Sequence, residues 1–149
     1  MDKIRILIVD DHSLVRRGLR ALLEAEPDLQ LIGEAVNGAD GVAQAAALRP
    51  DVVVMDISMP EMDGLEATRR IRAADPSQRV LILTVHAMER YLFAVLKAGA
   101  SGYVLKSTID TELIEAIRTV ARGGAFLYPN AAQMLLTDYL SRARSSDEA

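Results

Sequence analysis

Five polar side chains directly follow short apolar segments of this sequence. They are two adjacent carboxylates, a third carboxylate, a hydroxyl group and an ammonium group: Asp10, Asp11, Asp56, Thr84 and Lys106. Because the carboxyl ends of parallel strands meet at one edge of a sheet, we expect these side chains to share a rim. Three carboxylates that lie together repel one another, and burial raises the cost of their charge. The pattern therefore predicts a divalent cation at this rim.

The chemistry that this set favours is phosphoryl transfer to a carboxylate. Mg²⁺ prefers oxygen ligands and takes one or two carboxylates together with phosphate oxygens. Lys106 and Thr84 would offer a positive charge and a hydroxyl donor to the phosphoryl oxygens. A carboxylate can itself be the nucleophile, and Asp56 is central on the expected rim. Each residue alone has a simpler explanation as a cap, a turn residue or a surface charge, but their coincidence at four strand ends favours the phosphoryl site.

Alternating strand and helix patterns must position this rim. The strand candidates are Ile4–Val9, Leu29–Val36, Val52–Asp56, Val80–Val85 and Gly102–Leu105. The helical patterns run from an N-cap at Ser13 to a stop at Pro27, over Ala39–Leu48, Leu65–Ala74 and Glu89–Ala98, and onward from about residue 108. This alternation predicts an α/β fold, a doubly wound five-stranded parallel sheet in the flavodoxin-like order 2-1-3-4-5. In that order the first strand lies beside the third, which brings Asp10 and Asp11 next to Asp56.

A further helical pattern follows Pro129. It carries Met134, Leu135, Tyr139 and Leu140 at helical spacing and fades into a polar tail over 145–149, which we expect to be frayed. The sequence therefore predicts one domain over residues 1–128, followed by a helix and tail over residues 129–149.

Composition narrows the class of protein. The chain has 149 residues and a formal charge of −4, so charge gives it no reason to bind nucleic acid or an anionic membrane. It has no cysteine and two histidines, which excludes a disulfide framework and leaves us expecting no zinc site. No apolar run approaches the roughly 20 residues that a membrane span needs. We expect a soluble, cytoplasmic protein.

The motifs together resemble the response-regulator receiver domain, the phospho-accepting part of two-component signalling. They are Val9-Asp10-Asp11-His12, Met55–Gly64, Thr84 and Lys97–Lys106, spread over about residues 3–123. The fine pattern is similar to the NarL/FixJ branch, in which a LuxR-type helix-turn-helix domain follows the receiver. On this resemblance, residues 1–128 are the receiver and residues 129–149 are a linker helix with a frayed tail.

The resemblance implies a role for each residue of the metal site. Asp56 would be the phosphorylated aspartate. Asp11 and Asp56 would bind Mg²⁺ directly, with the backbone carbonyl of Ser58 as a third protein ligand. Asp10 would act largely through water. An aspartate-nucleophile phosphatase generally has a second acid two residues after its nucleophile, and Ser58 stands at that place here.

The resemblance also implies a switch. Lys106 would pair with Asp56 and then with the phosphoryl group, while Thr84 would bind a phosphoryl oxygen and draw its loop inward. Tyr103 would be the aromatic residue whose rotamer follows Thr84. Many receivers have a proline in a cis bond after the lysine, but Ser107 stands here, so the geometry of this bond is left open.

The function that follows is phosphorylation of Asp56 by a sensor histidine kinase in a Mg²⁺-dependent reaction, without substrate turnover. The modification would change the face formed by the fourth helix, fifth strand and fifth helix and so control a DNA-binding domain. We expect a homodimer on activation, contact with DNA only through a domain absent from this chain, and no contact with a membrane. The alternatives are a stand-alone or degenerate receiver that acts through protein contacts and, with less support, a phosphatase.

Overall fold

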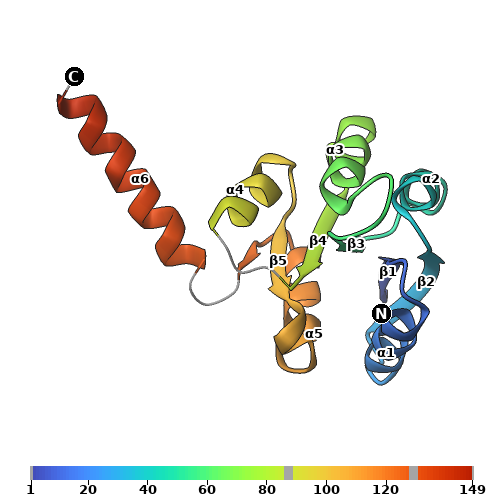
Figure 1. The fold of residues 1–149 in the computed structure, drawn as a ribbon. Coiled ribbons are helices and arrows are strands. Elements are labelled where there is room, and N and C mark those ends of the chain that lie inside the picture. Colours follow the sequence, from blue (N-terminus) through green and yellow to red (C-terminus); the bar gives the residue numbers. More distant parts are fainter. Residues whose placement is uncertain (1, 86–88, 128–130, 149) are drawn as a thin grey trace.

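A parallel β-sheet forms the centre of the chain in a computed structural model that describes residues 2–85, 89–127 and 131–148 (Figure 1). The strands are β1 (Ile4–Val9), β2 (Leu29–Ala35), β3 (Val52–Asp56), β4 (Arg79–Thr84), β5 (Gly102–Leu105) and β6 (Phe126–Leu127). Their order is β2-β1-β3-β4-β5-β6, and each neighbouring pair is parallel. The predicted order 2-1-3-4-5 is confirmed. The sheet has a sixth strand that we did not predict, because two residues are too short to form a hydrophobic pattern.

Helices cover both faces of this sheet. They are α1 (Ser13–Glu24), α2 (Gly38–Leu48), α3 (Gly64–Ala74), α4 (Glu89–Lys97), α5 (Ile109–Ala121) and α6 (Ala131–Glu148), with the 3₁₀ helix η1 (Lys106–Thr108) before α5. One core cluster joins the sheet to α2, α3 and α4, and the other joins it to α1 and α5. The doubly wound arrangement is therefore as predicted.

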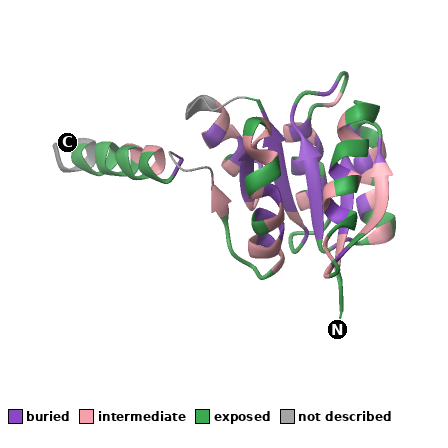
Figure 2. Cartoon of the chain, turned by 90° about the horizontal axis from the view of Figure 1, so that it is seen from below, coloured by how far each residue is buried: buried purple, intermediate pink, exposed green. Residues whose placement is uncertain are grey.

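The alternation of side chains in the strands builds these two layers. Leu7 and Val9 of β1 belong to the cluster beneath α2, α3 and α4, whereas Ile6 and Ile8 belong to the cluster beneath α1 and α5. β3 is buried along its whole length, and the central strands of the sheet form the buried centre in Figure 2. A strand that is covered by helices on both faces has an almost continuous apolar sequence, which is why Val52–Asp56 was predicted as a buried strand.

The ends of two helices are organised by aspartate and asparagine side chains. Asn37 caps α2 by accepting a hydrogen bond from the Asp40 amide, and Asp63 caps α3 by accepting one from the Glu66 amide. The prediction that Ser13 caps α1 is wrong. The helix begins at Ser13 itself, with His12 before it, and the His12 amide donates to Asp10 Oδ1 at 2.8 Å. Asp10 therefore shapes the turn that Ser13 was expected to organise.

Helix α6 extends away from the sheet (Figure 1). Its first turns contact the domain through buried Ala131 and partly buried Met134 and Leu135, whereas Leu136 and Tyr139 are exposed. The helix continues to Glu148, so the backbone is helical over 145–148, where we expected fraying. Among the described helices, none combines the length and the apolar character that crossing a membrane requires.

Candidate functional site

The carboxyl ends of β1, β3 and β4 bring three polar side chains to one rim. Val9 pairs with Met55, so Asp10 and Asp56 follow neighbouring residues of adjacent strands. Thr84 ends β4, the strand on the other side of β3. Asp10, Asp56 and Thr84 are each 1% exposed. The sheet therefore brings together the strand ends that the sequence analysis expected to meet.

Lys106 reaches this rim from the start of η1, immediately after β5. Its Nζ lies 2.9 Å from Asp56 Oδ1 and 3.6 Å from Asp10 Oδ2. The described residues contain no cis peptide bond, so the bond from Lys106 to Ser107 is trans. The ammonium group is thus placed between two buried carboxylates from different strands.

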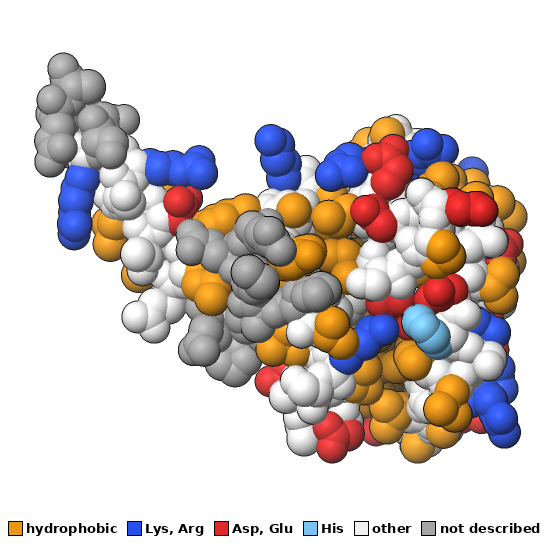
Figure 3. All heavy atoms as spheres, viewed as in Figure 1, with side chains coloured by type: hydrophobic (Ala, Val, Ile, Leu, Met, Phe, Trp, Pro, Cys, Tyr) orange, Lys and Arg blue, Asp and Glu red, His pale blue; other side chains and the backbone are white. Residues whose placement is uncertain are grey.

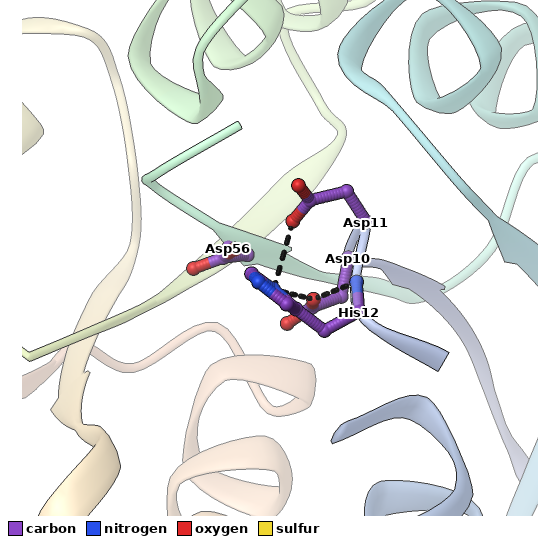
Figure 4. Close-up of side chains that lie close together, drawn as sticks. All are labelled: Asp10, Asp11, His12 and Asp56. Atoms are coloured by element: carbon purple, nitrogen blue, oxygen red, sulfur yellow. Dashed lines mark hydrogen bonds and ion pairs between the residues drawn. The ribbon is translucent and has the colours of Figure 1, made fainter. Parts of the chain in front are cut away.

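The carboxylates form a group that fits a divalent cation (Figure 4). Ligand atoms of Asp10, Asp11, His12 and Asp56 all lie within 4.8 Å of one another. Among the residues that the structure describes, none donates a hydrogen bond to the buried oxygens Asp10 Oδ2, Asp11 Oδ1 and Asp56 Oδ2. Buried carboxylate oxygens without donors are costly unless a cation binds them. These residues therefore fit the Mg²⁺ that the sequence predicted.

Burial and neighbouring charge act together on the nucleophile candidate. Burial raises the pKa of Asp56 above its ordinary value, and the negative charge of Asp10 raises it further. The hydrogen bond and positive charge of Lys106 oppose this increase without cancelling it. A bound divalent cation would lower the pKa of Asp56 and keep it ionised, which is the form that can attack phosphorus.

Ser58, the remaining predicted metal ligand, lies two residues after Asp56 and is exposed. The structure records no contact of its backbone oxygen with the carboxylates, so its role as a ligand stays a prediction. His86, which follows Thr84 by two residues, lies outside the described residues.

Thr84 and Tyr103 occupy neighbouring strands. Tyr103 pairs with Ile82, and Thr84 pairs with Leu105 two positions further along. Since side chains two residues apart in a strand share a face, Thr84 and Tyr103 lie on the same side of the sheet. Tyr103 is completely buried in the cluster beneath α2, α3 and α4. Their coupling as a switch stays a prediction.

Gly64 has a role at the site that the sequence analysis missed. Its amide donates to the Ile57 carbonyl at 3.0 Å, which folds the loop after β3 back on the strand. A Cβ atom here would lie 2.1 Å from the backbone oxygen of Asp56, far inside van der Waals contact. Thr68 reinforces the turn by donating to the Gly64 carbonyl at 2.7 Å. Gly64 directly precedes the helix predicted over Leu65–Ala74, and no pattern in the sequence reveals so close an approach.

His12 is a second residue whose position the sequence did not reveal. Its Nδ1 lies 3.0 Å from Asp11 Oδ1 and 3.3 Å from Asp10 Oδ1 (Figure 4). In the space-filling view, the histidine of the described residues lies beside acidic side chains on an open face of the molecule (Figure 3). The sequence does place His12 directly after the acidic pair, but that spacing does not reveal the direction of the His12 side chain.

Comparison with known proteins identifies the family. Residues 6–118 match the model of the response regulator receiver domain. The chain belongs to this family. It is 41% identical over 138 residues to the transcriptional regulatory protein DegU of Brevibacillus brevis, an alignment that covers 93% of the chain and 58% of DegU. It is also 41% identical over 145 residues to LiaR of Bacillus subtilis, covering 97% of the chain and 67% of LiaR.

Solved structures of receiver domains have the same fold. A two-component response regulator of the LuxR family from Aurantimonas sp. SI85-9A1 superposes with a TM-score of 0.87 at 37% identity, over 93% of this chain and 99% of that one. The receiver domain of the putative response regulator NarL from Mycobacterium tuberculosis superposes with a TM-score of 0.79 at 32% identity, over 83% of this chain and 99% of that one. The predicted family, its NarL/LuxR branch and the receiver fold are confirmed. The receiver chain spans about three fifths of DegU and two thirds of LiaR, at 58% and 67%.

Proposed function

We propose that this receiver accepts a phosphoryl group on Asp56 from the phosphohistidine of a sensor histidine kinase. The observation that carries the proposal is the contact between Lys106 Nζ and Asp56 Oδ1 at 2.9 Å, beside carboxylate oxygens that accept no hydrogen bond. A buried carboxylate that is held by a cation on one oxygen can present its other oxygen to an electrophile. The proposed reaction modifies the chain itself, without turnover of a substrate.

The residues of the rim have separate parts in this reaction. A carboxylate oxygen of Asp56 attacks phosphorus, the phosphorus–nitrogen bond of the donor breaks, and its electron pair returns to the donor imidazole. Lys106 and the Thr84 hydroxyl bind phosphoryl oxygens as charge develops on them. Mg²⁺, held by Asp11, Asp56 and the Ser58 carbonyl with Asp10 acting through water, would supply further positive charge to those oxygens.

The proposed output is a change on the face formed by α4, β5 and α5. Lys106 starts the segment that joins β5 to α5, and Thr84 ends β4 just before α4. Phosphorylation would draw Thr84 toward the phosphoryl group, with Tyr103 following, while Lys106 would pass from Asp56 to that group. One covalent change would thereby bias a two-state surface. Because DegU and LiaR are named as transcriptional regulatory proteins, we propose that the surface controls a DNA-binding domain, in the cytoplasm and with homodimerisation on activation.

Phosphorylation can be tested with a small donor. The chain is incubated with acetyl phosphate and Mg²⁺, and intact mass should increase by one phosphoryl group. Asp56→Asn should abolish labelling, and chelation of Mg²⁺ should suppress it in the unmodified chain. Asp75→Asn, a change at an exposed aspartate that follows α3, is the matched control and should label normally.

The same experiment separates the alternatives. Labelling that persists in Asp56→Asn would assign the nucleophile elsewhere. A chain that binds Mg²⁺ but never acquires the group would be a degenerate receiver that acts through protein contacts. Continuous release of phosphate from a generic phosphoester, lost in Asp56→Asn, would favour the phosphatase.

A further inference from the structure

We propose that His12 is an additional metal-ligating residue, which makes the rim a site for a divalent transition metal such as Zn²⁺ as well as for Mg²⁺. The inference rests on the proposed function because it uses the same carboxylates. It concerns which cations the rim selects, a property that the carboxylates alone do not determine.

The first support is the spacing of the atoms. His12 Nδ1 lies 3.0 Å from Asp11 Oδ1 and 3.3 Å from Asp10 Oδ1. Ligand atoms bound to zinc at about 2.0–2.2 Å, in tetrahedral or octahedral directions, lie roughly 3 Å from one another. The nitrogen is thus separated from each of the two oxygens by the distance expected between neighbouring ligands of one ion.

The second support is that the short contact to Asp11 is not a hydrogen bond. Asp11 Oδ1 is buried and accepts no hydrogen bond, although the imidazole nitrogen lies 3.0 Å away. At that distance an aligned N–H would have satisfied the oxygen. The ring thus places Nδ1 at ion-pair distance from a carboxylate oxygen that accepts no hydrogen bond from the described residues. A shared cation would satisfy both atoms.

The third support is the way in which His12 is held. Its backbone amide donates to Asp10 Oδ1 at 2.8 Å, so the residue is tied to the rim through its main chain. The imidazole is 62% exposed and has no packing role to explain its direction toward the carboxylates. Asp10 and Asp56 lie beneath it, each 1% exposed, with Oδ2 of both carboxylates free of hydrogen bonds. A metal ion would therefore have buried oxygen ligands below and an imidazole on its solvent side.

The preference of each metal ion for oxygen or nitrogen ligands then determines which ion His12 favours. Mg²⁺ binds oxygen and gains little from an imidazole, whereas Zn²⁺ and its neighbours bind imidazole nitrogen well. Our expectation of no zinc site rested on the small number of histidines and the lack of cysteine. It overlooked that zinc also accepts carboxylate oxygens, and here the fold supplies three carboxylates around one imidazole.

Calorimetric titration of the metal-free chain with Zn²⁺ and, separately, with Mg²⁺ tests the proposal. His12→Ala should weaken Zn²⁺ binding by about tenfold or more and change Mg²⁺ binding by less than about twofold. His12→Asn should behave in the same way. The matched control is Leu14→Ala, which removes a side chain that is 77% exposed two residues away and should change neither affinity.

A spectroscopic readout locates the metal. In the ¹⁵N NMR spectrum of the imidazoles, one equivalent of Zn²⁺ should shift the signal that His12→Ala removes, and Asp56→Asn should weaken that shift. Unchanged Zn²⁺ affinity in both His12 variants, or an unshifted His12 signal, would overturn the inference. Acetyl phosphate labelling in Mg²⁺ distinguishes the failure of this inference from the failure of the proposed function. If the chain is labelled normally but His12 does not affect Zn²⁺ binding, the proposed function stands and this inference is wrong.

Discussion

The ammonium group of Lys106 lies 2.9 Å from Asp56 Oδ1 and 3.6 Å from Asp10 Oδ2, so one cation contacts buried carboxylates from two adjacent strands. Asp11 and His12 complete the ring of possible ligands. The rim holds three carboxylates and one ammonium group, and this excess of negative charge is the physical reason to expect a divalent cation there.

Replacing Lys106 should show how much the repulsion between these carboxylates destabilises the fold. Lys106→Met keeps much of the apolar stem but leaves Asp56 and Asp10 without a cation. Because Lys106 is partly exposed at 20%, we expect a loss of about 1–3 kcal/mol in the free energy of unfolding, less than for a fully buried pair. Urea titration without Mg²⁺ measures it. Saturating Mg²⁺ should recover part of the loss, and an unchanged midpoint would show that the ion pair is not stabilising.

Asp56→Asn should stabilise the metal-free protein at neutral pH. Since the native pKa of Asp56 is raised, the folded state binds its proton more tightly than the unfolded state does. Stability therefore falls as the pH rises from the ordinary carboxyl range through the raised pKa, and the neutral amide avoids this loss. The gain should be on the order of 1 kcal/mol near pH 7 and should shrink toward about pH 4. Thermal unfolding of both chains across that range is the measurement.

Mg²⁺ should raise the melting temperature of the unmodified chain. A ligand that binds only the native state at about ten times its Kd stabilises by about 1.4 kcal/mol. Asp11→Asn removes one carboxylate of the ring and should reduce the Mg²⁺-induced shift, whereas Asp75→Asn should preserve it. An equal shift in all three chains would place the binding of Mg²⁺ outside the rim.

Gly64→Ala should destabilise the fold and disturb the site. The new Cβ would meet the Asp56 carbonyl oxygen at 2.1 Å and the Ile57 Cα at 2.8 Å, both backbone atoms that cannot rotate away. We expect a loss of about 1–3 kcal/mol and weaker phosphorylation of Asp56. Gly18→Ala is the matched control, since nothing lies within 4 Å of its Cβ position in α1. That change should stabilise by about 0.5–1 kcal/mol. Equal effects at both positions would contradict the role assigned to Gly64.

Arg118 joins α5 to the connection before β2 and should confer pH-dependent stability. Its guanidinium group donates to both carboxylate oxygens of Asp28 at 2.9 Å and to Glu26 at 3.0 Å. The hydrogen bond to Arg118 holds the pKa of Asp28 below its ordinary value. This contribution is present above the unfolded pKa of Asp28 and is lost as the pH falls through the native pKa.

Arg118→Met should therefore melt at a lower temperature than the unmodified chain near neutral pH, with the difference narrowing in acid. The matched control is Arg17→Met on the exposed face of α1, which should not change the pH profile. A difference in melting temperature that is independent of pH would attribute the effect of Arg118 to packing.

The predictions from sequence succeeded where the signal is local. Three strands were predicted with the bounds that the structure has, because a buried parallel strand is a largely apolar run: Ile4–Val9, Val52–Asp56 and Gly102–Leu105. Gly99 directly follows the helix predicted over Glu89–Ala98, and its positive φ of 98° is typical of a glycine at the end of a helix. Ser13 failed as a cap because the helix begins at Ser13 itself, and the Arg16 amide that a Ser13 cap would bind donates to the His12 carbonyl instead.

The amino-acid sequence by itself determined the alternation of strands and helices, the sheet order and the polar residues at the strand ends, because periodicity and chain direction are local properties. The tertiary structure decided which side chains share an ion. The contact of Lys106 with two carboxylates, the approach of His12 to Asp11 and the close passage of Gly64 over Asp56 each depend on side-chain directions and backbone distances between segments far apart or sharply turned. Such relations arise only when packing fixes the segments in space, and no spacing along a chain encodes them directly.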